Sequence, residues 1–459
     1  MTTAIALDLG TTSIKAGYLN QDGSLVNIIS SPAPKIIVSG GQYESDAIAY
    51  AESAERILLQ CLTDSLSKPT SNLGICCQRS SFLIWNKSCG EPITPLISWQ
   101  DSRGSVSCQD LQQEEMIIQG LTGLRLTPYY FAPKLRMLLL AHPDWREKLL
   151  NGEYLVGTLD TFLIWRWTGG KQFITDASMA ARTLLMDIKL CQWSPKLCDI
   201  FDIPLDILPK ITHSNELTIN LDNGLVLQAS LGDQSAAYFS SVGFDNHTAL
   251  VNLGTGGFVL HRMNQEINPA GYLRTLLYQD KEAHANIAIE GTLNSISEAL
   301  TKYPVNECSI EEMGKSDIYC ISEPSGLGAP YFRKDYGMCF SQSVDELTPR
   351  QIGCLLLEGI IFRVARILDD FSQESTIDRV LLSGGLSELI PLQQGIAECT
   401  PKKVFRLNQK DSSLRGAAML AAGIDIAEQN YGDVATGSGG NLAIKYQRWK
   451  SWLDSILHL

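Results

Sequence analysis

The sequence has 459 residues, which is long for a single hydrophobic core and predicts two domains. A net charge of −13 argues against a nucleic-acid-binding protein, and it means that an anionic ligand must be held by local groups. No run reaches the roughly 18 apolar residues that a membrane span requires, so no membrane partner is expected.

The N-terminal run MTTAIALDLG has no basic start, and its apolar stretch ends at Asp8, so it does not resemble a signal peptide. The 12 cysteines are scattered without a C-x-x-C pair, which predicts reduced thiols packed as small hydrophobic side chains. The 6 histidines are scattered too, and no zinc cluster is expected. Together these features predict a cytoplasmic protein.

The first half of the chain alternates short apolar runs with helical patterns. Residues 3–8 and 14–19 are predicted strands joined by a turn at 11–12. Apolar residues at helical spacing predict a helix over 45–64, with Ser45 as its N-cap. The other predicted elements are strands at 72–77, 81–85 and 225–231 and a largely helical stretch from 105 to 150.

The second half repeats this alternation. Strands are predicted at 248–253 and 257–262, and the run RVLLSGG at 379–385 predicts a strand that enters a Gly-Gly turn. The pair Thr348-Pro349 is typical of a helix start. The predicted helices are 288–300, 350–371 and 413–428.

Between the halves, Gly243 and the pair Asp245-Asn246 interrupt the pattern. We therefore predict an N-terminal domain at 1–243 and a C-terminal domain at 244–459. Both mix strands and helices, so the predicted fold class is α/β with two similarly built domains.

The same turn occurs once in each half. IALDLGTTSIKAGYL (5–19) and LVNLGTGGFVL (250–260) both run from an apolar stretch through Asp or Asn to Leu-Gly-Thr and back to apolar residues. Glycine lets the backbone approach a ligand closely, and successive N–H groups with threonine hydroxyls suit phosphate oxygens. Two such turns predict a clamp that holds a polyphosphate from both sides, although each alone is also compatible with a simple tight hairpin.

Other nucleotide signatures are absent from the sequence. Gly314-Lys315-Ser316 ends like a P-loop, but Ser309 occupies the position of the first glycine and no strand precedes it. No G-x-G-x-x-G follows a strand, which weakens a dinucleotide-binding interpretation.

Several motifs, in order, resemble the FGGY family of carbohydrate kinases, and within it glycerol kinases most closely. The family motifs are DLGTTSIK (8–15), GDQSAAYF (232–239), NLGTGGF (252–258), GLGAPYF (326–332) and SGG (383–385). The segments closest to glycerol kinases are CQRSSFLIWNK (77–87), ISWQDSR (97–103), TGLRLTPYY (122–130), GTLDTFLIWRWTGG (157–170) and TDASMAARTLLMDI (175–188). The resemblance implies two related actin/hexokinase-like (ribonuclease H-like) domains flanking an ATP cleft.

The resemblance also implies roles for particular residues. Asp233 would be the general base, and a helix N-cap is the alternative reading of this residue. Asp8, with Asp233, would bind Mg²⁺, largely through water. The residues implied for ATP are Gly10, Thr11, Thr12, Ser13 and Lys15 in the first turn, Gly254, Thr255 and Gly256 in the second, and Gly384 and Gly385 beside the adenosine.

The implied acceptor pocket suits a polyol, because arginine and aspartate bond hydroxyl groups while aromatic faces cover C–H edges. Its residues are Arg79, Ser80, Trp99, Tyr129, Asp233, Gln234 and Phe258, with Gln100 and Asp101 as supporting groups. Trp99 and Phe258 are equally compatible with core aromatics, Lys15 with a solvated strand lysine, and Arg103 with a structural role.

Three positions depart from the glycerol kinase pattern. Ser80 stands where an acidic residue follows the pocket arginine, and a serine is a weaker acceptor than a carboxylate. Leu389 replaces an asparagine at the adenine edge, which predicts loose base selectivity. The segment LTINLDNGLVLQAS (217–230) replaces a Gly- and Arg-rich regulatory loop, so regulation by fructose bisphosphate is not expected.

The sequence therefore predicts ATP-dependent phosphorylation of a small polyol or sugar, with glycerol, giving glycerol 3-phosphate, as the first candidate. A ketopentose kinase acting on ribulose or xylulose is the alternative. A nucleotide-binding protein without turnover is the third hypothesis, because fold alone does not fix function. The sequence leaves open whether the protein is a monomer or a homodimer.

Overall fold

A computed structural model describes residues 3–64, 70–263, 269–408, 410–424, 431–434 and 440–458. The chain forms two compact units that interleave in sequence. Unit 1 contains residues 1–243, 275–287 and 411–427, and unit 2 contains 244–274, 288–410 and 428–459. The predicted boundary after Gly243 coincides with one of the crossing points, but two later segments return to unit 1. The two continuous domains stay a prediction.

Unit 1 is built on a sheet with the strand order β14-β15-β6-β1-β2-β3 among the described residues. Its strands are β1 (Ala4–Leu9), β2 (Ser13–Leu19), β3 (Leu25–Pro32), β6 (Asn72–Cys77), β14 (Asn215–Asn220) and β15 (Val226–Gly232). The central strand β1 pairs antiparallel with β2 and parallel with β6. Since β6 and β15 are also parallel, the ends of β1, β6 and β15 meet at one edge of the sheet.

A second sheet in unit 1 has the order β4-β5-β8-β7-β9. The remaining strands of the unit are β4 (Ile37–Ser39), β5 (Gln42–Ser45), β7 (Phe82–Asn86), β8 (Leu96–Ile97), β9 (Tyr154–Thr158), β10 (Ile174–Asp176), β11 (Met186–Asp187), β12 (Gln192–Trp193) and β13 (Lys210–Thr212). Its α-helices are α1 (Ala47–Asp64), α2 (Ser105–Asp110), α3 (Glu115–Thr122), α4 (Phe131–Ala141), α5 (Pro143–Leu150), α6 (Leu159–Trp167), α7 (Ala177–Ala180), α8 (Pro195–Phe201), α9 (Asp233–Val242) and α13 (Ser412–Ala422). Short 3₁₀ turns are η1 (Gln112–Glu114), η2 (Ala181–Thr183) and η3 (Leu205–Ile207).

Unit 2 repeats the strand arrangement of unit 1. Its strand β16 (Thr248–Leu253) pairs antiparallel with β17 (Gly257–Arg262) and parallel with β22 (Arg379–Ser383), just as β1 pairs with β2 and β6. The sheet order is β18-β19-β17-β16-β22-β23-β24 among the described residues. The strands not yet given are β18 (Leu273–Gln279) and β19 (Ala285–Leu293), which both cross from one unit to the other, and β20 (Cys320–Ile321), β21 (Cys339–Phe340), β23 (Lys403–Leu407) and β24 (Tyr431–Asp433).

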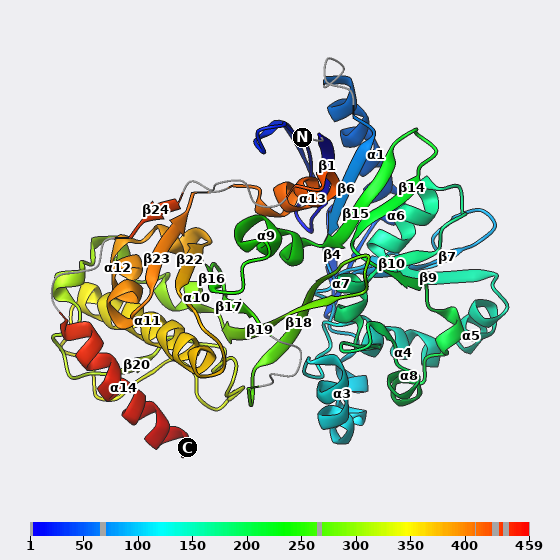
Figure 1. Ribbon diagram of the computed structural model, residues 1–459. Helices are drawn as coiled ribbons and strands as arrows, with labels where there is room; N and C mark the ends of the chain where they lie inside the picture. The colour runs from blue at the N-terminus through cyan, green and yellow to red at the C-terminus, as the bar shows by residue number, and fades with distance from the viewer. Residues whose placement is uncertain are drawn as a thin grey trace. The chain divides into compact units, whose positions relative to one another are not determined.

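The long helix α11 (Pro349–Glu374) packs in the core of unit 2 (Figure 1). It begins with a capping box, in which the Thr348 hydroxyl accepts from the Gln351 N–H and the Gln351 side chain accepts from the Thr348 N–H. The other helices of the unit are α10 (Ile296–Leu300), α12 (Ile390–Cys399) and α14 (Asn441–Leu457), with 3₁₀ turns η4 (Val305–Glu307), η5 (Ile310–Glu312) and η6 (Gly385–Glu388). None of the helices described is long and apolar enough to cross a membrane.

Most predicted elements are present, and three details are wrong. Residues 285–293 form strand β19, so the predicted helix at 288–300 is reduced to α10. Ser45 ends β5, and Asp46 caps α1 instead, with its carboxylate accepting from the Ala49 N–H at 2.9 Å. The C-terminal Ala-rich helix ends at Ala422, and residues 425–428 of that prediction lie outside the described residues. All twelve cysteines are free thiols, as expected.

Candidate active site

The first glycine turn of unit 1 joins β1 to β2 and is closed by its own backbone. The Gly10 N–H donates to the Ser13 carbonyl at 3.1 Å, and a Cβ at Gly10 would lie 2.8 Å from that same oxygen. Residues 10–13 are at most partly buried, and Thr12 is exposed. The backbone is therefore fixed at a position where only glycine fits without a shift.

Gln78, at the end of β6, connects this turn to the neighbouring segments. Its side-chain carbonyl accepts from the Thr11 hydroxyl at 3.1 Å and from the Ser81 hydroxyl at 3.0 Å. The Trp99 indole N–H donates in turn to Thr11 at 3.0 Å, and the Trp99 backbone N–H donates to Ser81 at 3.0 Å. Residues that are far apart in the sequence are thus joined in one hydrogen-bond network, and Trp99 lies directly beside the turn.

Asp8 lies on β1 immediately before the turn. Its carboxylate accepts from the Ser413 hydroxyl at 2.6 Å. Burial raises the pKa of Asp8, hydrogen bonding to Ser413 opposes this, and the negative charge of Asp233 raises the pKa further. Asp8 and Asp233, two of the predicted site residues, therefore lie close enough to repel one another.

Lys15 faces Asp8 across the β1–β2 pair. Its ammonium group binds Asp411 at 2.7 Å, and this hydrogen bond raises the pKa of Lys15. The lysine is thus a partner of Asp411, a contact that the sequence did not predict, rather than a purely solvated side chain.

Asp233 is the first residue of α9, which starts where β15 ends. The N-cap is Gly232, so the alternative role of Asp233 as N-cap is wrong. The carboxylate oxygen Oδ1 lies 3.3 Å from Arg79 Nε and accepts from the Gln234 backbone N–H at 2.7 Å. A Cβ at Gly232 would lie 2.6 Å from Arg79 Cδ, so this glycine gives Arg79 the space to reach Asp233.

The aromatic residues predicted for the acceptor pocket in unit 1 form a pair. The rings of Trp99 and Tyr129 meet edge to face with centroids 6.4 Å apart. Both remain accessible, at 40% and 50% exposure, so Trp99 is not a core aromatic.

Ser80 is buried and adopts the left-handed conformation, with φ of 63°. Its hydroxyl donates to the Arg182 carbonyl at 2.7 Å, so only its lone pairs remain to accept from a ligand. Among the predicted supporting residues, Arg103 binds Asp101 through two nitrogens at 2.8 Å each, which supports its structural role.

In unit 2 the Gly-Thr turn at 254–256 and the Gly-Gly turn at 384–385 lie side by side. Because β16 and β22 are parallel, the Gly254–Gly256 turn and Gly384 follow neighbouring strand ends, where Asn252 Nδ2 donates to Ser383 Oγ at 3.1 Å. Gly384 has φ of 86°, and its Cβ would lie 2.4 Å from the Leu253 carbonyl oxygen. A Cβ at Gly385 would meet no heavy atom within 4 Å. This edge of unit 2 therefore presents exposed backbone, including the accessible Thr255.

Two further residues of unit 2 were singled out by the sequence. Phe258 pairs in register with Asn252 and is partly buried. Leu389 packs against the core of unit 2, so at this position the chain has an apolar contact where the family pattern has an amide.

Comparison with known proteins decides the family. The model of the FGGY carbohydrate kinase N-terminal domain matches residues 3–252, and that of the C-terminal domain matches residues 249–423. The chain belongs to the FGGY family of carbohydrate kinases. It is thus a phosphotransferase with an alcohol group as acceptor, and the predicted family, enzyme class and two-domain α/β fold are confirmed.

Curated relatives of this FGGY kinase include glycerol kinases. Those of Saccharolobus islandicus (strain M.16.27) and Pseudomonas syringae pv. tomato are each 29% identical over 437 and 444 residues, covering 91% of this chain and 87% of theirs. Among solved structures, Plasmodium falciparum glycerol kinase with ADP has a TM-score of 0.83 at 23% identity, covering 99% and 98% of the two chains. Xylulose kinase from Rhodospirillum rubrum has the same TM-score at 18% identity, covering 99% of both. The fold is therefore shared by kinases of different acceptors.

Asp176 is a buried carboxylate of the FGGY kinase whose role no sequence motif indicated. It accepts from the hydroxyls of Ser178 and Ser214 and, at 3.0 Å, from the Met179 N–H. Ser178 Oγ also accepts from the Gly232 N–H at 2.8 Å, so Asp176 supports the residue next to Asp233. Only a contact between segments 54 residues apart reveals this role.

Burial raises the pKa of Asp176 to about 7, which predicts a stability difference that depends on pH. The folded-state pKa lies above the unfolded value of about 3.9, so this contribution to stability is complete below pH 4 and is lost as the pH rises through 7. We compare the free energies of unfolding of wild type and Asp176→Asn. The wild-type value minus the variant value should fall by a few kcal/mol between pH 4 and 8, because each unit of pKa difference corresponds to about 1.4 kcal/mol. Denaturant titrations at several pH values measure it. Asp206→Asn, at an exposed site, is the control, and a difference independent of pH would contradict the assignment.

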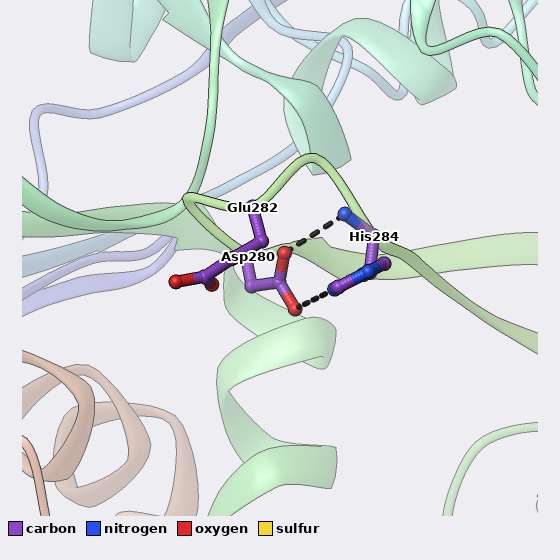
Figure 2. Close-up of side chains that lie close together, drawn as sticks. All are labelled: Asp280, Glu282 and His284. Carbon is purple, nitrogen blue, oxygen red and sulfur yellow. Dashed lines mark hydrogen bonds and ion pairs between the residues drawn. The ribbon is translucent and has the colours of Figure 1, made fainter.

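One further group of polar side chains lies at the β18–β19 turn (Figure 2). Ligand atoms of Asp280, Glu282 and His284 lie within 4.8 Å of one another, a cluster that the scattered histidines did not predict. Asp280 accepts from the His284 backbone N–H at 2.8 Å and contacts its ring Nδ1 at 3.1 Å. These bonds account for the arrangement as a turn, and we assign it no ligand.

Proposed function

We propose that this FGGY kinase transfers the γ-phosphoryl group of ATP to a hydroxyl of a small polyol, with glycerol as the first candidate acceptor. The observation that carries the proposal is the Asp233–Arg79 pair, which lies on unit 1 at the end of β15 and close to Asp8. The glycerol kinases among the relatives favour glycerol, and the Trp99–Tyr129 pair offers aromatic surface for the C–H edges of a polyol.

In the proposed reaction Asp233 accepts the proton of the acceptor hydroxyl as its oxygen attacks the γ-phosphorus. The new bond joins the acceptor oxygen to phosphorus, and the bond from phosphorus to the bridging oxygen of ADP breaks. Phosphoryl transfer of this kind depends mainly on positioning and on charge stabilisation. Arg79 positions Asp233 through their ion pair, and its guanidinium group can donate a charge-assisted hydrogen bond to a polyol hydroxyl.

Each unit carries glycine turns whose backbone suits a part of ATP. In unit 1, backbone N–H groups and hydroxyls of residues 10–13 would bind phosphate oxygens. In unit 2, the Gly254–Gly256 turn would bind phosphate, and Gly384 with the open space beside Gly385 would leave room for the adenosine. The loss of the family asparagine at Leu389 predicts weak selection among nucleotide bases.

The oxygen donors of unit 1 fit Mg²⁺. The negative charges of Asp8 and Asp233 repel one another, and a divalent cation would relieve this repulsion. The Ser413 hydroxyl donates to the Asp8 carboxylate and helps to hold it in place. Both carboxylates would hold the ion, directly or through water, and when bound it would neutralise charge on the transferred phosphoryl group.

An acceptor panel tests the proposal. ADP release from Mg-ATP is measured with glycerol, tetritols, ribulose and xylulose, and without acceptor. Saturable turnover that is highest with glycerol supports the proposal. A preference for ribulose or xylulose would instead support the alternative of a ketopentose kinase, the class to which the xylulose kinase structure belongs. ATP binding without turnover on any acceptor would overturn the assignment of kinase activity to this site.

Ser80 is proposed to accept a hydrogen bond from the acceptor while donating to the Arg182 carbonyl. Ser80→Ala should then raise the acceptor KM about fivefold with kcat nearly unchanged, the effect of losing one neutral hydrogen bond of about 1 kcal/mol. Steady-state kinetics with the best acceptor of the panel measure this. An unchanged KM with a lower melting temperature would show that the hydroxyl serves Arg182 alone.

A further inference from the structure

Lys134 is a fully buried lysine in the first turns of α4, on unit 1. Its ammonium nitrogen donates to the carbonyl oxygen of Ser98 at 2.8 Å and to that of Ser80 at 3.3 Å. It also lies 5.8 Å from the centre of the Phe82 ring. The charge is thus surrounded by backbone oxygens and an aromatic face rather than by water.

These two carbonyls belong to segments that carry proposed acceptor residues. Ser80 follows Arg79, and Ser98 precedes Trp99. A fourth proposed acceptor residue, Tyr129, lies just before the helix that carries Lys134, and its ring contacts Trp99. Lys134 therefore connects three segments, from separate parts of the chain, that carry proposed acceptor residues.

A buried ammonium has a cost that its contacts must offset. Burial lowers the pKa of Lys134 to about 7. The negative charge of Asp101 raises this pKa, and the positive charge of Arg103 lowers it further. A methionine would fill similar space without this desolvation cost. The specific contribution of the lysine is therefore its pair of hydrogen bonds to the Ser80 and Ser98 carbonyls.

We propose that Lys134 is a positioning residue for the acceptor site, which fixes the Arg79–Ser80 and Ser98–Trp99 segments relative to each other and to Tyr129. The proposal rests on the acceptor role of these residues in the proposed function. It predicts that loss of the ammonium group affects the binding of the acceptor more than that of the nucleotide, because both hydrogen bonds of the ammonium group go to Ser80 and Ser98 and neither goes to a proposed phosphate-binding turn.

The test compares Lys134→Met, Lys134→Arg and Lys445→Met. Lys445 is the matched control, because it is a buried lysine of unit 2 that is paired with Glu358. For Lys134→Met we expect an acceptor KM that is about tenfold or more above wild type, with the KM for ATP within about twofold, as the loss of charge-assisted hydrogen bonds implies. Lys134→Arg, which keeps a donor cation, should recover part of the difference. Lys445→Met should lower the melting temperature and leave both KM values unchanged.

Hydrogen exchange gives a readout that needs no turnover. In Lys134→Met the backbone amides of residues 79–82 and 98–101 should exchange faster than in wild type, and in Lys445→Met they should not. If wild type phosphorylates no acceptor, the proposed function fails, and exchange alone decides the positioning role. Unchanged exchange in both segments, or a Lys134→Met variant that loses stability while keeping its acceptor KM, would overturn the proposal.

Discussion

Replacing Asp233 by asparagine should lower kcat with the acceptor by about 10²–10⁴-fold, the range for removal of a general base. The amide has the same shape but cannot take up the proton of the attacking hydroxyl. It also removes the negative partner of Arg79, which lies 3.3 Å from the carboxylate. The measurement is ADP release at saturating acceptor and Mg-ATP.

Two controls separate chemistry from folding in this experiment. Binding of ADP without Mg²⁺ to Asp233→Asn, measured by titration calorimetry, should stay within a few-fold of wild type, because Asp233 is proposed to hold the metal ion and unit 2 supplies the proposed adenosine contacts. Asp222→Asn, a change of the same kind at a site of unit 1 outside the proposed site, should keep full activity. Asp233→Asn with more than a tenth of wild-type kcat would rule out a general base at this position and leave only a positioning role.

The parts of the fold that the sequence predicted are those set by local signals. The Gly-Thr turns are bounded by apolar strands in both halves, and β1, β2, β16 and β17 form within one residue of the predicted ranges. The α11 start followed from Thr348-Pro349 because a cap is also a local contact. Such features need only a few neighbouring residues.

The helix predicted at 288–300 failed for a physical reason. Strand β19 is almost entirely buried, including its polar residues Asn286 and Glu290, so it lacks the regular alternation of apolar and polar side chains that marks a strand with one exposed face. A short run without that alternation suits a buried strand and a buried helix equally. Its neighbours in the sheet, and not its own sequence, decide the outcome.

The candidate site shows the same division. Asp8, Arg79 and Asp233 were predicted from motifs, but the side chains that hold or support them were not. Ser413 bonds Asp8 from 405 residues away, and Lys134 reaches Ser80 over 54 residues. A serine or lysine carries no local mark of such a contact, and only the folded chain brings the partners together.

Substituting Gly416 by alanine should destabilise the protein strongly and lower its activity. Gly416 lies in α13, which packs against α9, and an added Cβ would lie 1.9 Å from the Ala236 carbonyl oxygen (Figure 1). Because the obstacle is backbone, the helices must separate, and overpacking of this kind costs about 1–3 kcal/mol or more. Since α9 begins at Asp233, the shift also displaces the proposed base. We expect a melting temperature lower by several degrees, at about 2–4 °C per kcal/mol, and a reduced kcat.

Gly120→Ala is the matched control, because it makes the same change inside helix α3. No heavy atom from outside this part of the helix lies within 4 Å of the added Cβ, so the higher helix propensity of alanine should raise stability by up to about 1 kcal/mol. The predicted changes in stability of the two variants thus have opposite signs, although helix propensity alone would stabilise both. Calorimetric melting curves with kcat measured in parallel distinguish the cases. A Gly416→Ala protein as stable and active as Gly120→Ala would show that α13 and α9 are not in close backbone contact at Gly416, and that this contact does not position Asp233.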